Sequence, residues 1–62
     1  MIFLNIQARC REHHISIREL ESICGIGNGT IYKWQTSSPA VDKVKLVADY
    51  FGCTIDELLK ED

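Results

Sequence analysis

The alternation of apolar and polar positions over residues 16–24 predicts a short amphipathic helix. Ser16 and Glu19 have the spacing of a capping box, in which each side chain caps the backbone of the other, so the helix should begin at Ser16. Gly25 follows the last apolar position and suits the left-handed residue that ends many helices. The predicted inward face consists of Ile17, Leu20, Ile23 and Cys24, and the outward face of Arg18, Glu19, Glu21 and Ser22.

A second short helix is predicted over residues 28–35, where the apolar spacing resumes. Ile31 and Trp34 are three residues apart and mark its buried face, so Trp34 is expected in the core and not as a stacking platform for single strands. The exposed stripe consists of Asn28, Gly29, Tyr32 and Lys33. An amide, a bare backbone, a phenol and an ammonium in one stripe suit contact with the major groove of DNA.

A merely solvated face is the alternative interpretation of this stripe, and two glycines weigh against it. Gly27 and Gly29 flank Asn28, and a glycine inside a helix costs about 1 kcal/mol relative to alanine. Close approach of the backbone to another molecule, such as DNA, would offset that cost. Residues 16–35 are therefore predicted to form a helix-turn-helix that contacts DNA.

Helical periodicity also covers the N-terminal part of the chain. A helix is predicted from about Ile2 to His13, with Phe3, Ile6 and Cys10 on its inward side. Neither strand alternation nor a linker or repeat interrupts the helical pattern, so the 62 residues are expected to form one all-α domain. Such a small core should give a stability of only about 3–5 kcal/mol.

Two more helices are predicted in the C-terminal half. Ser38 as a cap and Pro39 at the first helical position predict the start of a helix that Gly52 ends. A second capping box at residues 54–57 opens a final helix that runs through Leu59. The apolar stripe of the longer helix consists of Val41, Val44, Val47, Ala48 and Phe51.

Several motifs occur in the order and spacing of a known family. They are Ile15-Ser16-Ile17 with Leu20-Glu21, Gly-Asn-Gly-Thr-Ile-Tyr-Lys-Trp at 27–34, Ser37-Ser38-Pro39, Ala48-Asp49-Tyr50-Phe51 and Ile55-Asp56-Glu57-Leu58-Leu59. In these motifs, and over nearly its whole length, the chain resembles the lambda-repressor-like (Cro/C1, XRE-type) helix-turn-helix domains, in particular small phage-type regulators of Gram-positive bacteria. The resemblance implies a compact five-helix bundle. In such a bundle the helix at about 28–35 enters the major groove, and the start of the helix at 16–24 touches phosphate.

The chain departs from the family pattern at four positions. Family members commonly pair an arginine near the end of the first helix with a glutamate ending the recognition helix, and these positions are Cys10 and Gln35 here. Both charges are absent together, so the fold need not suffer. Glu21 stands where a small alanine is often found. His14 stands where a glycine often closes the first helix, and histidine tolerates a positive φ better than most residues but with more strain than glycine.

The net charge is the main objection to DNA binding. Seven basic and nine acidic residues give −2, whereas DNA-binding domains are usually basic. The charge is uneven, because residues 1–45 carry six basic and four acidic side chains (+2), and residues 46–62 carry one basic and five acidic (−4). We therefore expect the acidic end to face away from DNA or toward a partner, and the DNA affinity to be modest.

Other classes of function have weaker support. Cys10, His13 and His14 are spaced i, i+3 and i+4, and Cys24 and Cys53 could complete a zinc site, but the tight ligand pairs typical of zinc are missing. The cysteines are expected to be structural thiols in the reducing cytoplasm. A bundle of this size has little room for a substrate cleft, so no enzyme, cofactor or small-molecule substrate is expected.

No membrane association is expected either. No stretch approaches the roughly 20 apolar residues that a membrane span requires, and the apolar start at residues 1–4 lacks the basic segment of a signal peptide.

Together with these patterns, the family resemblance implies a sequence-specific transcriptional regulator of the phage-repressor type, which binds double-stranded DNA as a homodimer on a roughly two-fold operator. Asn28 is the candidate for bidentate contact to adenine, and Lys33 for guanine or phosphate. Thr30 and Tyr32 suit a thymine methyl group or phosphate. The predicted contacts to the DNA backbone are Ser16, Arg18, Ser37, Ser38 and Lys43.

A protein-interaction module that keeps the bundle without binding DNA is the alternative, and the net acidity favours it. Only a DNA-binding protein shows a steep loss of duplex affinity with salt, so this measurement separates the two hypotheses. The sequence leaves open whether the regulator represses or activates.

Overall fold

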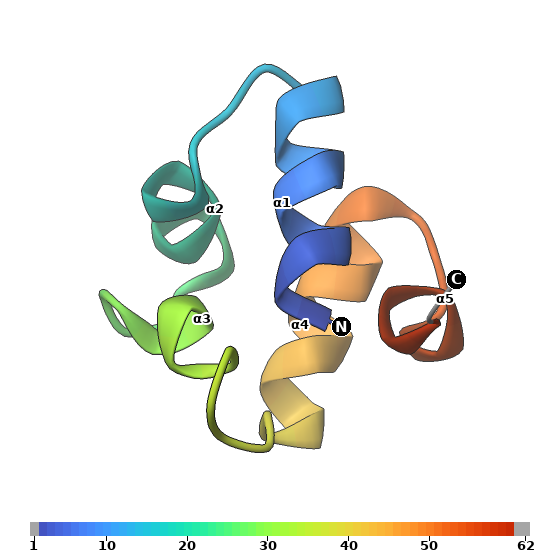
Figure 1. Ribbon diagram of the computed structural model, residues 1–62. Coiled ribbons are helices and arrows are strands. Elements are labelled where there is room, and N and C mark those ends of the chain that lie inside the picture. Colours follow the sequence, from blue (N-terminus) through green and yellow to red (C-terminus); the bar gives the residue numbers. More distant parts are fainter. Residues whose placement is uncertain (1, 61–62) are drawn as a thin grey trace.

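A computed structural model describes residues 2–60, which form an all-α bundle of five helices (Figure 1). Both α1 and α4 pack against α2 on one side and against α5 on the other, and α3 packs on α2. None of these helices is long and apolar enough to cross a membrane. The helices are α1 (Ile2–Glu12), α2 (Ile17–Cys24), α3 (Thr30–Lys33), α4 (Val41–Phe51) and α5 (Ile55–Leu59).

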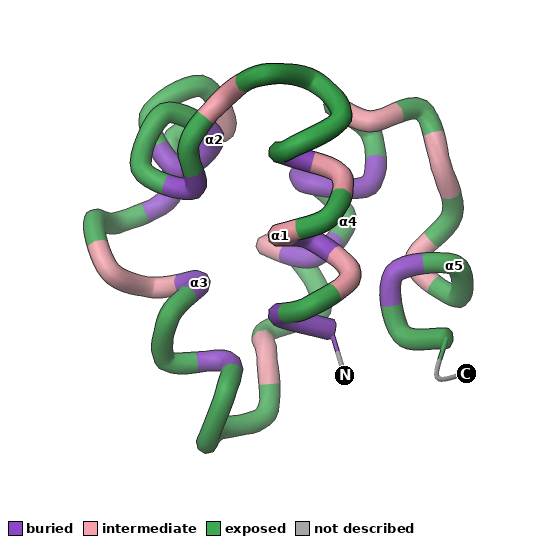
Figure 2. Tube along the Cα trace, turned by 45° about the horizontal axis from the view of Figure 1, so that its top comes forward, coloured by how far each residue is buried: buried purple, intermediate pink, exposed green. Residues whose placement is uncertain are grey.

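One core unites buried apolar side chains from all five helices, and Figure 2 shows buried positions on each of them. The predicted inward side of α1 is confirmed, and so is the burial of Trp34, which is 6% exposed. The buried apolar residues are Ile2, Phe3, Ile6, Cys10, Ile17, Leu20, Ile26, Ile31, Trp34, Val44, Val47, Ala48 and Leu58.

Both predicted capping boxes are present. At the start of α2 the Ser16 N–H donates to Oε1 of Glu19 (3.2 Å), and the Glu19 N–H donates to Oγ of Ser16 (3.0 Å). At the start of α5 the equivalent bonds between Thr54 and Glu57 measure 3.0 and 3.1 Å. A capping box lies within four consecutive residues, so both helix starts follow from local sequence.

Three helices end in the same hydrogen-bonded turn around a residue with a left-handed backbone. These residues are His14 (φ 58°), Gly25 (φ 70°) and Gly52 (φ 70°). In each turn the following N–H donates to the carbonyl five positions earlier, which defines a Schellman motif. The three bonds are Ile15 to Cys10 (3.0 Å), Ile26 to Glu21 (2.8 Å) and Cys53 to Ala48 (3.0 Å).

The start predicted for α4 is wrong. The turn after α3 continues to Ser37, whose N–H donates to the Lys33 carbonyl (2.9 Å), so residues 38–40 are needed as the connection to the next helix. The N-cap is Ala40, and its carbonyl accepts the first bonds of α4. Ser38 therefore caps nothing, and Val41, predicted in the apolar stripe, is 70% exposed.

A polar side chain fastens α5 to α1. Nδ2 of Asn5 donates to the carbonyls of Leu58 (2.6 Å) and Lys60 (2.7 Å). Because these carbonyls have no partner within a helix that ends at Leu59, Asn5 satisfies the C-terminus of α5 from more than fifty residues away in sequence.

Candidate nucleic-acid interface

The regular helix α3 spans only Thr30–Lys33, so the prediction of a helix over 28–35 is wrong at both ends. Beyond it the Gln35 N–H donates to the Tyr32 carbonyl (3.3 Å) and the Thr36 N–H to the Lys33 carbonyl (3.1 Å). These are i to i−3 bonds, as in a 3₁₀ helix. The chain therefore continues past α3 as tight turns.

Asn28 and Gly29 lie in the turn before α3, not within a helix as predicted. Gly29 is the N-cap and has a φ of 86°, a conformation that other residues avoid. A Cβ added there would meet nothing within 4 Å, so backbone conformation explains this glycine. Gly29 is not inside a helix, so no close approach to DNA is needed to offset the cost of a glycine in a helix. At Gly27 an added Cβ would lie 3.2 Å from Oγ1 of Thr30.

Glu21 of α2 is buried, at 2% exposed, whereas its predicted position was in water. Its Oε1 accepts a hydrogen bond from the Gly29 N–H (3.1 Å), and its Oε2 accepts one from the Ile31 N–H (2.9 Å). Because no side chain at the N-cap of α3 caps that helix, Glu21 caps it from the neighbouring helix.

The spacing along α2 could have revealed this role. Glu21 occupies an inward position of the helical repeat, and a charged residue at such a position implies a partner. Ile23, predicted inward, lies off this repeat and is 55% exposed. The i, i+3, i+4, i+7 stripe consists of Ile17, Leu20, Glu21 and Cys24.

The two sides of α3 differ as the sequence predicts. Ile31 is fully buried and Trp34 almost so, while Tyr32 is 52% exposed and Lys33 is also exposed. The ring of Tyr32 is tilted against that of Phe3 on α1, with 5.5 Å between centroids. The core thus holds one side of α3 and leaves the other available to a partner.

Two surface pockets bring predicted DNA-binding residues together. A pocket of about 250 Å³ is lined by Arg18 from α2 and Asn28 from the turn. Another of about 310 Å³ is lined by Ser16 and Tyr32. The second pocket also includes Arg11 of α1, which the sequence analysis did not assign to the site.

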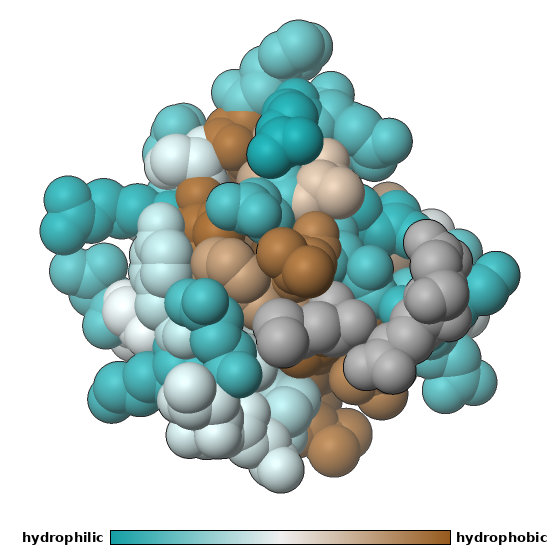
Figure 3. Space-filling model, in the orientation of Figure 1, coloured by the Kyte–Doolittle hydropathy of each residue, from teal (hydrophilic) through white to brown (hydrophobic). Residues whose placement is uncertain are grey.

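The remaining predicted backbone contacts lie nearer to α4. Ser37 and Ser38 are exposed in the connection between α3 and α4. Lys43 is half-buried in the first turn of α4. Figure 3, in the orientation of Figure 1, shows hydrophilic side chains along the outer edge of the side that carries α2 and α3.

Ion pairs divide the basic side chains into two groups. Nη2 of Arg9 lies 3.8 Å from Oε2 of Glu57, and Nζ of Lys45 lies 3.5 Å from Oδ1 of Asp49. The acidic C-terminal part therefore pairs with these two cations. Within residues 2–60, the basic side chains of the first 45 positions that form no ion pair are Arg11, Arg18, Lys33 and Lys43.

A comparison with protein families identifies the family of the chain. The model of the Cro/C1-type HTH DNA-binding domain matches residues 5–61. The chain belongs to this family. Searches of curated proteins and of solved structures found no match. Membership in the Cro/C1-type family makes this a helix-turn-helix domain and DNA binding its class of function.

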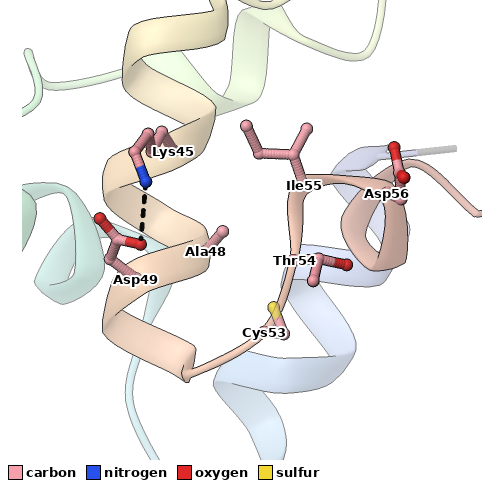
Figure 4. A pocket seen from close by; sticks show the side chains of 7 residues that line it. All are labelled: Lys45, Ala48, Asp49, Cys53, Thr54, Ile55 and Asp56. Carbon is pink, nitrogen blue, oxygen red and sulfur yellow. Dashed lines mark ion pairs between the residues drawn. The ribbon is translucent and has the colours of Figure 1, made fainter.

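The Cro/C1-type domain has a further pocket on its α4–α5 side (Figure 4). Its volume is about 340 Å³, and the ion pair between Lys45 and Asp49 lies on its α4 wall. Asp56 of α5 adds a second carboxylate. Paired and acidic side chains do not attract phosphate, so this pocket is not included in the candidate interface.

The cysteines of the Cro/C1-type domain occupy packing positions. Burial raises the pKa of the Cys10 thiol, with a further contribution from Cys24, and burial also raises the pKa of Cys24. A raised pKa disfavours the thiolate, which is the form that binds metal. Sγ of Cys24 donates to the Leu46 carbonyl (3.8 Å). Among residues 2–60 no group of three or more His, Cys, Asp or Glu is placed to hold a metal ion.

Proposed function

We propose that this Cro/C1-type domain is a sequence-specific transcriptional regulator of the phage-repressor type, which inserts the segment around α3 into the major groove of double-stranded DNA. The observation that carries the proposal is the difference between the two sides of α3. Ile31 and Trp34 anchor one side in the core, while Tyr32 and Lys33 extend into solvent. A helix anchored in this way offers side chains at fixed positions to a groove.

Base contacts come from the turn and from α3. Residues 27–29 form a turn with glycine at both ends, and this turn exposes Asn28 for a bidentate contact to adenine. Lys33 contacts guanine or phosphate, and Thr30 and Tyr32 contact a thymine methyl group or phosphate.

Phosphate contacts come from residues that precede α3 in the chain and from residues that follow it. Arg11 joins the predicted set, because it lines the same pocket as Ser16 and forms no ion pair within residues 2–60. Few cations are available to release counterions, so the affinity should be modest and should decrease with salt. The proposed set is Arg11, Ser16, Arg18, Ser37, Ser38 and Lys43.

We further propose that two copies bind a roughly two-fold operator as a homodimer, in the cytoplasm. A helix of four residues reaches few base pairs, so one copy has little sequence information to use. Two copies in major grooves one DNA turn apart, about 34–36 Å, double the number of base contacts.

Selection of bound sequences from a pool of random duplexes tests the proposal. The expected result is an enriched, two-fold symmetric motif, with an affinity that decreases steeply as salt is raised. No enrichment, together with no salt dependence on random duplex, would instead support a protein-interaction module of the same fold, which the net charge of −2 favours.

A further inference from the structure

The helix α3 depends on a side chain from another helix. It has four residues, or one turn, and so short a helix is not stable alone. Its first N–H groups have partners inside the protein. Glu21 accepts hydrogen bonds from Gly29 (3.1 Å) and Ile31 (2.9 Å), and the Thr30 N–H donates to the Gly27 carbonyl (3.1 Å).

This arrangement limits what Glu21 can do on DNA. It lines the same pocket as Arg18 and Asn28, so it lies beside the turn proposed to contact bases. At 2% exposed, however, its side chain is out of reach of a base edge. A carboxylate at the N-terminus of α3 also cancels the attraction that an open helix N-terminus has for phosphate.

We propose that Glu21 is a positioning residue for base recognition. By holding the N–H groups on both sides of Thr30, it fixes α3 relative to α2 and sets the conformation of the turn that carries Asn28. The inference rests on the proposed function, which is DNA binding through α3. It means that Glu21 controls sequence preference without touching DNA.

Glu21→Gln tests this inference because it keeps the shape of the side chain but replaces one acceptor oxygen with an amino group. That group would face a backbone N–H, so one of the two hydrogen bonds is lost. The variant also removes a negative charge near DNA, which favours attachment to any duplex. Specific and non-specific affinity should therefore change in opposite directions, whereas partial unfolding would weaken both.

The matched control is Glu57→Gln, which removes the same charge from a helix cap on α5. Affinities for a selected operator and for a scrambled duplex are measured at one salt concentration, where circular dichroism shows each variant folded. The ratio of the two affinities should decrease at least about tenfold in Glu21→Gln, the effect of losing one hydrogen bond to a buried charged group. The ratio should not change in Glu57→Gln.

Hydrogen exchange in the free protein provides a second measurement that needs no DNA. The Gly29 and Ile31 amides should exchange faster in Glu21→Gln than in wild type. The Ile26 amide, which donates to the backbone carbonyl of residue 21, should keep its rate, because α2 remains intact.

An unchanged affinity ratio overturns the inference, and so does an equal loss of affinity for both duplexes. If Glu21→Gln does not fold, Glu21→Asp takes its place, because it keeps the charge but shortens the reach to the Gly29 and Ile31 N–H groups, so the affinity ratio should decrease while the non-specific affinity stays the same. A wild type without sequence preference would refute the proposed function. In that case the exchange rates decide whether Glu21 holds the turn, and unchanged rates refute it.

Discussion

In the helix pairs α2–α3 and α4–α5, the first helix ends in the same way, but the second helix begins differently. Gly25 and Gly52 both have a φ of 70°, and each belongs to a Schellman motif. After Gly52, α5 is capped two residues later by Thr54 and its capping box. After Gly25, α3 does not begin until Thr30, and its N-cap, Gly29, has no side chain to cap it.

The start of α5 is therefore capped by residues of its own sequence, whereas the start of α3 is capped through a tertiary contact. The cap of α5 lies within its own four residues, so the start of α5 is set by local sequence. The cap of α3 comes from Glu21, which is eight residues away from Gly29 and on another helix. The proposed recognition segment is therefore set by packing against α2, and changes in α2 can alter what α3 recognises.

The largest expected effect comes from removing the tertiary cap. Glu21→Ala should lower the free energy of unfolding by about 2–3 kcal/mol, because it leaves N–H donors at a buried helix start without partners and each such donor costs about 1–3 kcal/mol. Much of the total stability of so small a domain would be lost. Urea denaturation measures the change.

Glu57→Ala is the local counterpart and should cost clearly less, because the Glu57 side chain is 54% exposed and water replaces its hydrogen bonds. Equal losses in the two variants would contradict the distinction between a local and a tertiary cap.

The next largest effect is on DNA binding, and it distinguishes base recognition by the α2–α3 pair from phosphate contact by α4. Asn28→Ala should cost about 1–3 kcal/mol on a selected operator and relax the preference at one base pair. Lys43→Ala should weaken binding to all duplexes nearly equally and make the salt slope shallower by about one unit. Binding titrations at several salt concentrations measure both. If Asn28→Ala leaves specificity intact, the turn is not the reading element.

The glycine turn that ends the first helix of both pairs gives a smaller effect on stability. Gly25→Ala and Gly52→Ala should each lower the free energy of unfolding by about 1 kcal/mol, because alanine is strained at a φ of 70°. The same motif at the end of α1 holds His14 at a φ of 58°, so His14→Gly should raise stability by up to about 1 kcal/mol. Thermal denaturation compares the three variants. A loss of stability in His14→Gly would show that the histidine ring contributes more than its backbone strain costs.

The features that could be predicted from sequence are those in which the physical cause lies within a few residues. The capping boxes at Ser16 and Thr54 and the turns at Gly25 and Gly52 are of this kind. Helical spacing also identified Trp34 as a core residue. The family resemblance then supplied the arrangement of the helices, which periodicity does not determine.

The wrong predictions of where α3 and α4 begin depend on contacts that lie outside the predicted segments. The Asn28-Gly29 dipeptide is a turn signal, but the carboxylate that caps the helix at Thr30 is on α2 and lies outside residues 28–35. Ser38 and Pro39 have a good local start signal, but the turn that runs to Ser37 leaves them in the connection. The assignment of individual residues to DNA contacts remains a prediction, because it depends on how the partner docks.

The smallest expected effect is the pH dependence of the local cap on α5. The hydrogen bond from the Thr54 backbone, and then that from the Thr54 side chain, lower the pKa of Glu57 below its ordinary value of 4.5. A carboxyl with a lowered pKa in the folded state stabilises the fold above the pKa of the unfolded state, and this contribution is lost as the pH falls through the lower value. The difference in unfolding free energy between wild type and Glu57→Gln should therefore be constant near neutral pH and shrink as the solution is acidified below pH 4.5. Urea denaturation at a series of pH values measures the difference. The effect should be small, because Glu57 is exposed to water, and a difference that grows on acidification would reverse the sign of the linkage and contradict the capping role.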